Sequence, residues 1–173
     1  NAYYVSTSIF FLVFIYIAYR QRSSYKSYKI HGRYFSFMFL ESILYALFLL
    51  FLMKNIYLME GLTSNIIFNF ILSIGAGIYE ELIFRVLMIF ILSKALSFIF
   101  KFSKIIVLSL SIMISSILFS AFHFLGVEIY TFDALLIRSL AGIYLSLIYI
   151  YRGFGIVALT HAFYDLFVIF RLT

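Results

Sequence analysis

Several long apolar runs dominate this sequence and limit what it can fold into. Residues 2–19, 34–53, 105–122 and 134–151 each form a run of at least 18 residues with few charges. An α-helix rises about 1.5 Å per residue, so each run is long enough to cross the roughly 30 Å hydrocarbon core of a bilayer. With 65% hydrophobic and 12% charged residues, the chain has too few charges to coat a water-soluble surface and too little polarity to stay disordered. The sequence therefore predicts an all-α integral membrane protein.

The apolar runs predict a single membrane domain over residues 1–173, built as a polytopic bundle of about six transmembrane helices. Residues 65–100 are too long for one span and barely long enough for two. We interpret them as one long helix over residues 65–93 followed by a cytoplasmic amphipathic stretch, because this choice keeps the basic loops on one side. Two spans in this segment would give seven in all and invert the second half of the chain. The six expected spans are residues 2–19, 34–53, 65–93, 105–122, 134–151 and 156–171.

A basic loop between the first two expected spans is the clearest topology signal. It contains five of the 13 Lys and Arg residues and no acidic residue. Basic residues concentrate in the cytoplasmic loops of membrane proteins, which places this loop in the cytoplasm and the protein in the cell membrane as a multi-pass protein. The same rule explains the net charge of +6 better than binding to nucleic acid does. The five residues are Arg20, Arg22, Lys26, Lys29 and Arg33.

Ionisable side chains inside the apolar runs mark where chemistry is expected. Each costs roughly 2.5–3.5 kcal/mol to insert at the bilayer centre, so each needs a partner or a role. Glu81 and Arg85 are four residues apart and can pair on one helix face, whereas Glu80 lies about 100° around the helix from Glu81 and has no such partner. His161 and Asp165 are also four residues apart. The full set of candidates is Glu41, Glu80, Glu81, Arg85, His123, Arg138, His161 and Asp165.

These groups together are the ones that activation of a water molecule requires. A carboxylate can take a proton from water, and an imidazole can hold that water or donate to a developing oxyanion. The chain contains no cysteine, which removes a thiol nucleophile and every cysteine-based zinc site. Each cluster alone could be structural, as an ion pair or an interhelical hydrogen bond, but three clusters on three apolar segments favour a catalytic site. Glu41 and Arg138 fit no motif, and we interpret them as packing or cavity-lining groups.

Three motifs in order make the sequence resemble the CPBP family of CAAX protease and bacteriocin-processing (Abi) membrane proteins. That family includes the type II CAAX prenyl endopeptidases. The resemblance covers residues 71–170, which we expect to form the catalytic core. The motifs are Glu80-Glu81-x-x-x-Arg85, Phe119-x-x-x-His123, which is preceded by Ser115, and His161-x-x-x-Asp165.

The resemblance implies a helix bundle that encloses a polar intramembrane cavity, and hydrolysis of a peptide bond there by a protease of the glutamate type. Our hypothesis for the mechanism is that Glu80, helped by His123, activates water. His161, positioned by Asp165, would stabilise the tetrahedral intermediate. Carried over by position, the catalytic residues are Glu80, His123, His161 and Asp165, and the supporting residues are Glu81, Arg85 and Phe119.

Asp165 departs from the prenyl endopeptidase relatives, which have Asn at this position. An ionised carboxylate only accepts hydrogen bonds, whereas an amide also donates. Either Asp165 is protonated, or it orients His161 and leaves the oxyanion to that histidine. A third reading is a divalent metal held by Glu80, His123, His161 and Asp165. The chain lacks the His-Glu-x-x-His spacing of the usual metalloprotease helix, so we favour a site without metal or cofactor.

The expected topology creates a conflict about depth in the membrane. It places His123 near the outer end of its span and His161 nearer the inner end of another. A shared site needs both imidazoles at a similar depth.

A non-catalytic membrane protein for bacteriocin self-immunity or scaffolding is the competing function, since it would keep the cavity for binding. A transporter is disfavoured because the polar set is compact and shows no paired broken helices.

The expected partners are a peptide or protein substrate and the lipid bilayer. Abundant Ile, Phe and Tyr without Trp, Cys or Pro is typical of an AT-rich coding bias, which favours bacterial peptide processing.

Overall fold

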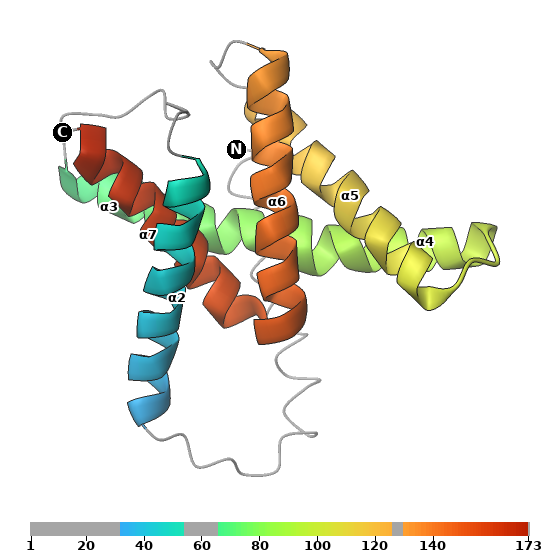
Figure 1. The fold of residues 1–173 in the computed structure, drawn as a ribbon, viewed down its shortest axis with the longest axis horizontal. Helices are drawn as coiled ribbons and strands as arrows, with labels where there is room; N and C mark the ends of the chain where they lie inside the picture. The colour runs from blue at the N-terminus through green and yellow to red at the C-terminus, as the bar shows by residue number, and fades with distance from the viewer. Residues whose placement is uncertain (1–31, 54–65, 126–129, 173) are drawn as a thin grey trace, which may run out of the picture. The chain divides into compact units, whose positions relative to one another are not determined.

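The computed structural model describes residues 32–53, 66–125 and 130–172 of the chain, and in these ranges every regular element is helical. The all-α prediction is therefore confirmed for them (Figure 1). The expected first span and the basic loop up to residue 31 lie outside the described residues. The elements are α2 (Gly32–Leu52), α3 (Ile66–Glu81), the π-helix η1 (Leu82–Met88), α4 (Ile89–Ile99), α5 (Lys104–His123), α6 (Phe132–Arg152) and α7 (Phe154–Leu172).

One long helix runs through α3, η1 and α4 without a break (Figure 1). This confirms the prediction of a single helix in the segment, although the helix continues past residue 93 to Ile99. In the described residues, four helices are long and apolar enough to cross a membrane: Gly32–Leu52, Ile67–Ile99, Lys104–His123 and Phe132–Arg152. The expected sixth span corresponds to α7, whose apolar part, Phe154–Ile169, is shorter.

Local sequence determines where α5 and α6 begin and where α6 ends. Ser103 and Thr131 cap the two N-termini, where their hydroxyls accept hydrogen bonds from backbone N–H groups three residues on. Gly153 ends α6 with φ +85°, a conformation that residues with a Cβ rarely adopt. This single glycine separates α6 from α7, so the chain reverses sharply between them.

Two helix pairs approach closely because glycine occupies the contact. A Cβ at Gly77 of α3 would lie 2.8 Å from the carbonyl oxygen of Ala158 and 2.9 Å from the backbone nitrogen of Ala162, both on α7. At Gly142 of α6, a Cβ would lie 3.0 Å from the side chain of Ser116 on α5. Small residues at such positions are the usual means by which membrane helices pack tightly. The contact at Gly77 sets the spacing between the two helices that carry most of the polar residues.

Buried hydroxyl groups on these helices are satisfied mainly within their own helix. Ser120 is one that bonds across an interface, since it donates to the carbonyl oxygen of Leu135 at 2.9 Å. Several other hydroxyls donate a hydrogen bond to the carbonyl oxygen four residues earlier in the same helix, which leaves none of these groups unpaired at the interface. These donors are Ser73, Ser111, Ser139, Ser146 and Thr160.

Helix α2 packs against α6 and α7 through an apolar cluster and an ion pair. Leu49 of α2 and Met53, the residue after its end, are buried against α6 and α7. Glu41 receives two hydrogen bonds from the guanidinium of Arg152, one of them 2.7 Å long. This ion pair connects α2 to α6, which agrees with the packing role expected for Glu41.

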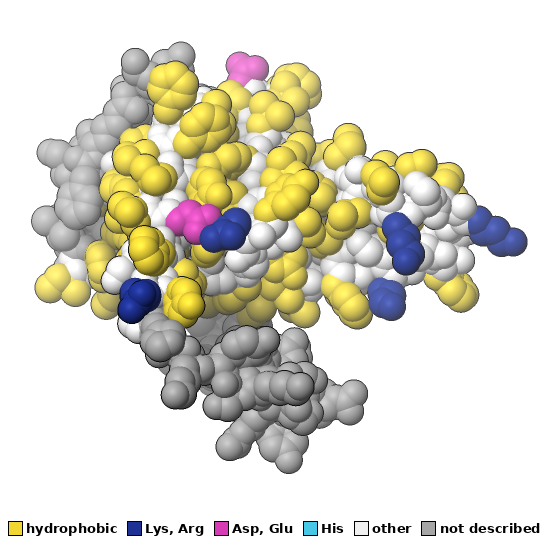
Figure 2. All heavy atoms as spheres, turned by 60° about the horizontal axis from the view of Figure 1, so that its bottom comes forward, with side chains coloured by type: hydrophobic (Ala, Val, Ile, Leu, Met, Phe, Trp, Pro, Cys, Tyr) yellow, Lys and Arg dark blue, Asp and Glu magenta, His cyan; other side chains and the backbone are white. Residues whose placement is uncertain are grey.

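The outward faces of the helices carry many large exposed apolar side chains (Figure 2). Soluble monomers rarely expose contiguous apolar patches of this extent, whereas a lipid-facing surface requires them. The apolar exterior and the four long helices make a multi-pass membrane protein plausible.

Candidate active site

Glu80, His123 and His161 come together from three different helices. The Oε2 atom of Glu80, near the end of α3, lies 3.7 Å from Nε2 of His123, the last residue of α5. The same oxygen lies 3.9 Å from Nε2 of His161 on α7. Both imidazoles therefore reach one carboxylate, although the expected topology places them toward opposite ends of their spans.

Glu81 connects His161 to Arg85 by its two carboxylate oxygens. Oε1 lies 2.7 Å from Nδ1 of His161, and Oε2 lies 2.9 Å from Nε of Arg85. The pairing with Arg85 follows the i,i+4 spacing in the sequence. The contact with His161 was not expected, since Asp165 was predicted to orient that ring. Asp165 lies instead near the other nitrogen, with Oδ1 at 3.8 Å from Nε2.

Both imidazoles use Nδ1 for an orienting hydrogen bond and direct Nε2 toward Glu80. In His123, Nδ1 lies 2.9 Å from the carbonyl oxygen of Phe119, one turn earlier on α5. A carbonyl and an ionised carboxylate only accept hydrogen bonds, so Nδ1 is the donor in both rings. In the neutral imidazole, Nε2 is then an acceptor. Glu80 Oε2 is itself buried and receives no hydrogen bond from the described residues.

The ring of Phe119 contacts three of the polar residues. The guanidinium carbon of Arg85 lies 4.2 Å from its centroid, which is a cation–π geometry. The rings of His123 and His161 meet it edge-on, with centroids 4.9 Å and 5.9 Å away. Phe119, predicted as a supporting residue, thus packs between the buried guanidinium and the imidazoles.

A π-helix begins directly after the two glutamates. It runs from Leu82 to Met88 and contains Arg85. Such wide turns are rare and frequently occur at functional sites. The hydroxyl of Ser115 on α5 donates to the carbonyl oxygen of Phe84 within this segment. The sequence pattern gave no sign of the π-helix, although Ser115 had been noted as part of the second motif.

The site is closed on one side and partly accessible on the other. The side chains of Glu81 and Arg85 are 0% and 1% exposed, whereas those of Glu80 and His123 are 16% and 24% exposed. An approaching molecule would therefore meet Glu80 and His123 first. Among the described residues, no group of three His, Asp or Glu side chains is arranged so that it could hold a metal ion.

Arg138, for which the sequence predicted no catalytic role, lies on α6. It is buried, and its guanidinium carbon is 5.6 Å from the ring centroid of Phe124, the residue after His123.

Comparison with protein families identifies a match to this chain. The family described as type II CAAX prenyl endopeptidase Rce1-like matches residues 62–167, which include all three motifs. No curated protein and no solved structure matches the chain.

Proposed function

The chain belongs to the Rce1-like type II CAAX prenyl endopeptidase family, and from that premise we propose that it is an intramembrane endopeptidase of the glutamate type. The family suggests the protease activity, and the geometry around Glu80 supports the catalytic type. One observation carries the proposal: Glu80 Oε2 faces the Nε2 atoms of His123 and His161 at 3.7 Å and 3.9 Å.

Two hydrogen-bond acceptors close to one another need a donor to bridge them. The carboxylate oxygen of Glu80 and Nε2 of a neutral His123 are both acceptors. His161 is charged in this proposal, because its ring nitrogens Nδ1 and Nε2 lie 2.7 Å and 3.8 Å from the carboxylates of Glu81 and Asp165. The 3.7 Å between Glu80 Oε2 and His123 Nε2 is too long for a direct hydrogen bond but short enough for one water molecule to bridge. The set therefore suits a bound water with its protons directed at Glu80 and His123, beside the Nε2–H donor of His161.

In the proposed reaction, Glu80 removes a proton from that water as its oxygen attacks the scissile carbonyl carbon, and His123 holds the water. The carbonyl oxygen becomes an oxyanion, to which a protonated His161 donates from Nε2 while Nδ1 stays bonded to Glu81. The tetrahedral intermediate then collapses, the C–N bond breaks, and Glu80 passes its proton to the leaving amine. Asp165, near Nε2 of His161, would help to keep that imidazole charged.

We propose as substrate a membrane-associated peptide that carries a lipid, as the description of the family indicates. The apolar exterior suits a substrate that arrives through the bilayer. Bacteriocin processing is a narrower hypothesis that the family match does not address.

The test is Glu80→Gln, which keeps the shape of the side chain and removes the base. Cleavage of a prenylated peptide by the purified protein should fall by about 10²–10⁴-fold, the usual contribution of a general base. Glu41→Gln is the matched control, because Glu41 is also a glutamate on an apolar helix but pairs with Arg152. Wild-type cleavage by the Glu80 variant would reject the proposal.

Two alternative functions predict different results in two further tests. A metal-dependent protease with ligands at Glu80, His123, His161 and Asp165 would lose activity on treatment with a chelator, whereas the proposed mechanism predicts no loss. A scaffolding or immunity protein would keep its biological effect after simultaneous replacement of Glu80, His123 and His161 by alanine.

A further inference from the structure

The hairpin between α4 and α5 carries a concentration of positive charge. Lys94 lies in the middle of α4, Lys101 in the connecting loop and Lys104 at the first residue of α5. The chain has no acidic residue between positions 82 and 127, so nothing nearby in the sequence offsets these charges. We name residues 94–105 the basic hairpin. Basic side chains cluster at the corresponding end of the molecule in Figure 2.

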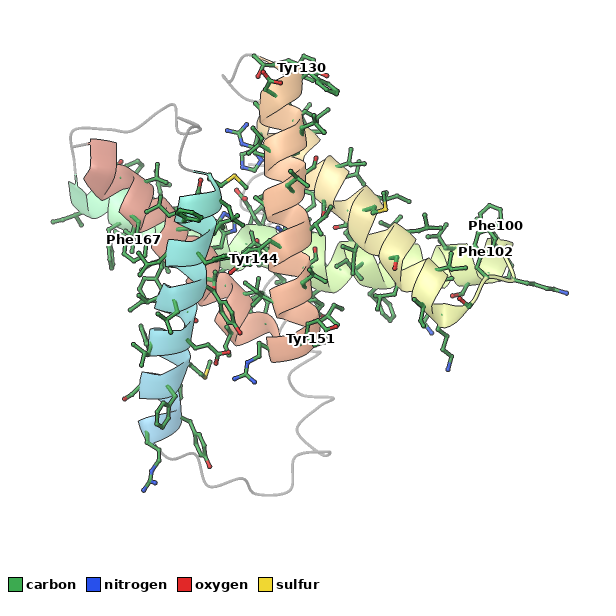
Figure 3. The ribbon with its side chains drawn as sticks, in the orientation of Figure 1. Phe100, Phe102, Tyr130, Tyr144, Tyr151 and Phe167 are labelled. Carbon is green, nitrogen blue, oxygen red and sulfur yellow. The ribbon has the colours of Figure 1, made fainter. Side chains whose placement is uncertain are left out.

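Large apolar side chains are exposed on the same hairpin. Residues 97–106 are all exposed, and Phe98, Ile99 and Ile105 are 92%, 66% and 78% exposed. Phe100 and Phe102 stack with centroids 5.1 Å apart and lie at the tip of the hairpin (Figure 3). The basic hairpin therefore combines exposed aromatic and aliphatic surface with lysine, and Ser97 and Ser103 are its polar neutral residues.

The length of the helix carries this hairpin to the edge of the membrane. The span Ile67–Ile99 contains 33 residues and is about 50 Å long at 1.5 Å per residue. The hydrocarbon core is only about 30 Å thick, so one end of the helix extends beyond it unless the helix tilts strongly. Lysine together with exposed Phe and Ile is the composition that favours the boundary between headgroups and acyl chains.

We propose that the basic hairpin binds the anionic headgroups of bilayer phospholipids, with Phe98 and its apolar neighbours in the acyl region. Lipid fits this surface better than a soluble protein does, because the apolar and the cationic side chains alternate along one short segment. An anionic bilayer satisfies both at once, and lysines near its surface are attracted without a shaped pocket. The proposal does not depend on the peptidase activity.

The first experiment measures lipid preference directly. The full chain is reconstituted in bilayers, and the association of spin-labelled phosphatidylglycerol is compared with that of spin-labelled phosphatidylcholine. The wild-type protein should prefer phosphatidylglycerol, and added salt should reduce the preference. In the triple variant Lys94→Gln, Lys101→Gln, Lys104→Gln this preference should be smaller. The ratio of phosphatidylglycerol to phosphatidylcholine association should fall by up to about fivefold for each charge removed.

The matched control is Lys94→Arg, Lys101→Arg, Lys104→Arg, which keeps the charges and should keep the preference. If the glutamine variant folds and retains the wild-type preference for phosphatidylglycerol, the proposal is refuted, and the hairpin remains a candidate surface for a soluble partner.

A second experiment tests the depth of the hairpin. Because the chain has no cysteine, Phe98→Cys provides one labelling position without further changes. A nitroxide there should collide more with oxygen, which partitions into lipid, than with a water-soluble nickel chelate. A label that collides mainly with the nickel chelate would place the hairpin in water and contradict the proposal.

Discussion

Replacing Gly77 with alanine should separate the two helices that form the candidate site. The added Cβ would lie 2.8 Å and 2.9 Å from two backbone atoms of α7, where ordinary contact begins at 3.4 Å. Backbone atoms cannot turn away as a side chain can, so α7 must retreat by about 0.6 Å to restore ordinary contact. Overpacking of this kind typically costs about 1–3 kcal/mol of unfolding free energy.

The same movement should reduce activity, because His161 moves with α7. Glu81 is one turn beyond Gly77, and its 2.7 Å hydrogen bond to His161 would be stretched or lost. Displacing a catalytic group by about 1 Å can cost about 10²-fold in rate, so we expect Gly77→Ala to lose about tenfold to a hundredfold in cleavage of a prenylated peptide.

Gly75→Ala is the matched control for this experiment. It makes the same change two residues away on α3, where a Cβ would meet nothing within 4 Å. It should unfold at the wild-type temperature or slightly above, since alanine is the better helix former, and it should cleave normally. If Gly77→Ala matches Gly75→Ala in both thermal unfolding and cleavage, the reasoning about the α3–α7 contact is refuted.

Three further substitutions test other contacts. Ser115→Ala removes the hydrogen bond to the π-helical carbonyl and should cost about 0.5–1.5 kcal/mol in thermal unfolding, whereas Ser115→Thr should restore most of it. Arg85→Met leaves the charge of Glu81 buried without its guanidinium partner and should cost about 3–5 kcal/mol of unfolding free energy. A double variant that also carries Glu81→Leu should be less destabilised than Arg85→Met alone. An equal or greater loss of unfolding free energy in the double variant would contradict the pairing. Arg152→Gln breaks the more exposed pair with Glu41, so its unfolding temperature should fall much less than that of Arg85→Met.

Helix periodicity made part of this arrangement predictable. Glu81 and Arg85 are separated by four residues, and the helix brings such residues onto one face whatever surrounds them. The single long helix was predictable from the membrane in another way, because one helix in that segment keeps the basic loops on one side of the bilayer. These predictions depend only on local geometry or on the membrane, which is why the sequence alone was sufficient.

Contacts between helices were not predictable in the same way. The hydrogen bond from His161 to Glu81 depends on how closely α3 approaches α7. Gly77 was a usable signal for that approach, because a glycine one turn before the paired glutamate allows a second helix to come near. The π-helix could not be predicted, since the spacing of the polar residues fits the ordinary α-helical period of about 3.6 residues. The relative depth of the two histidines was not predictable, because helix tilt is determined by packing against neighbouring helices and the sequence contains no signal for it.

The position of Phe119 has a consequence for how the charges of this protein influence one another. The Phe119 ring contacts a guanidinium on its face and makes T-shaped contacts with two imidazoles. It therefore places one apolar side chain among three groups that can carry a positive charge. Its π-electrons attract the guanidinium, and its bulk keeps water from reaching that side. A substitution that changes the electron density of this ring would therefore change its electrostatic interaction with all three groups.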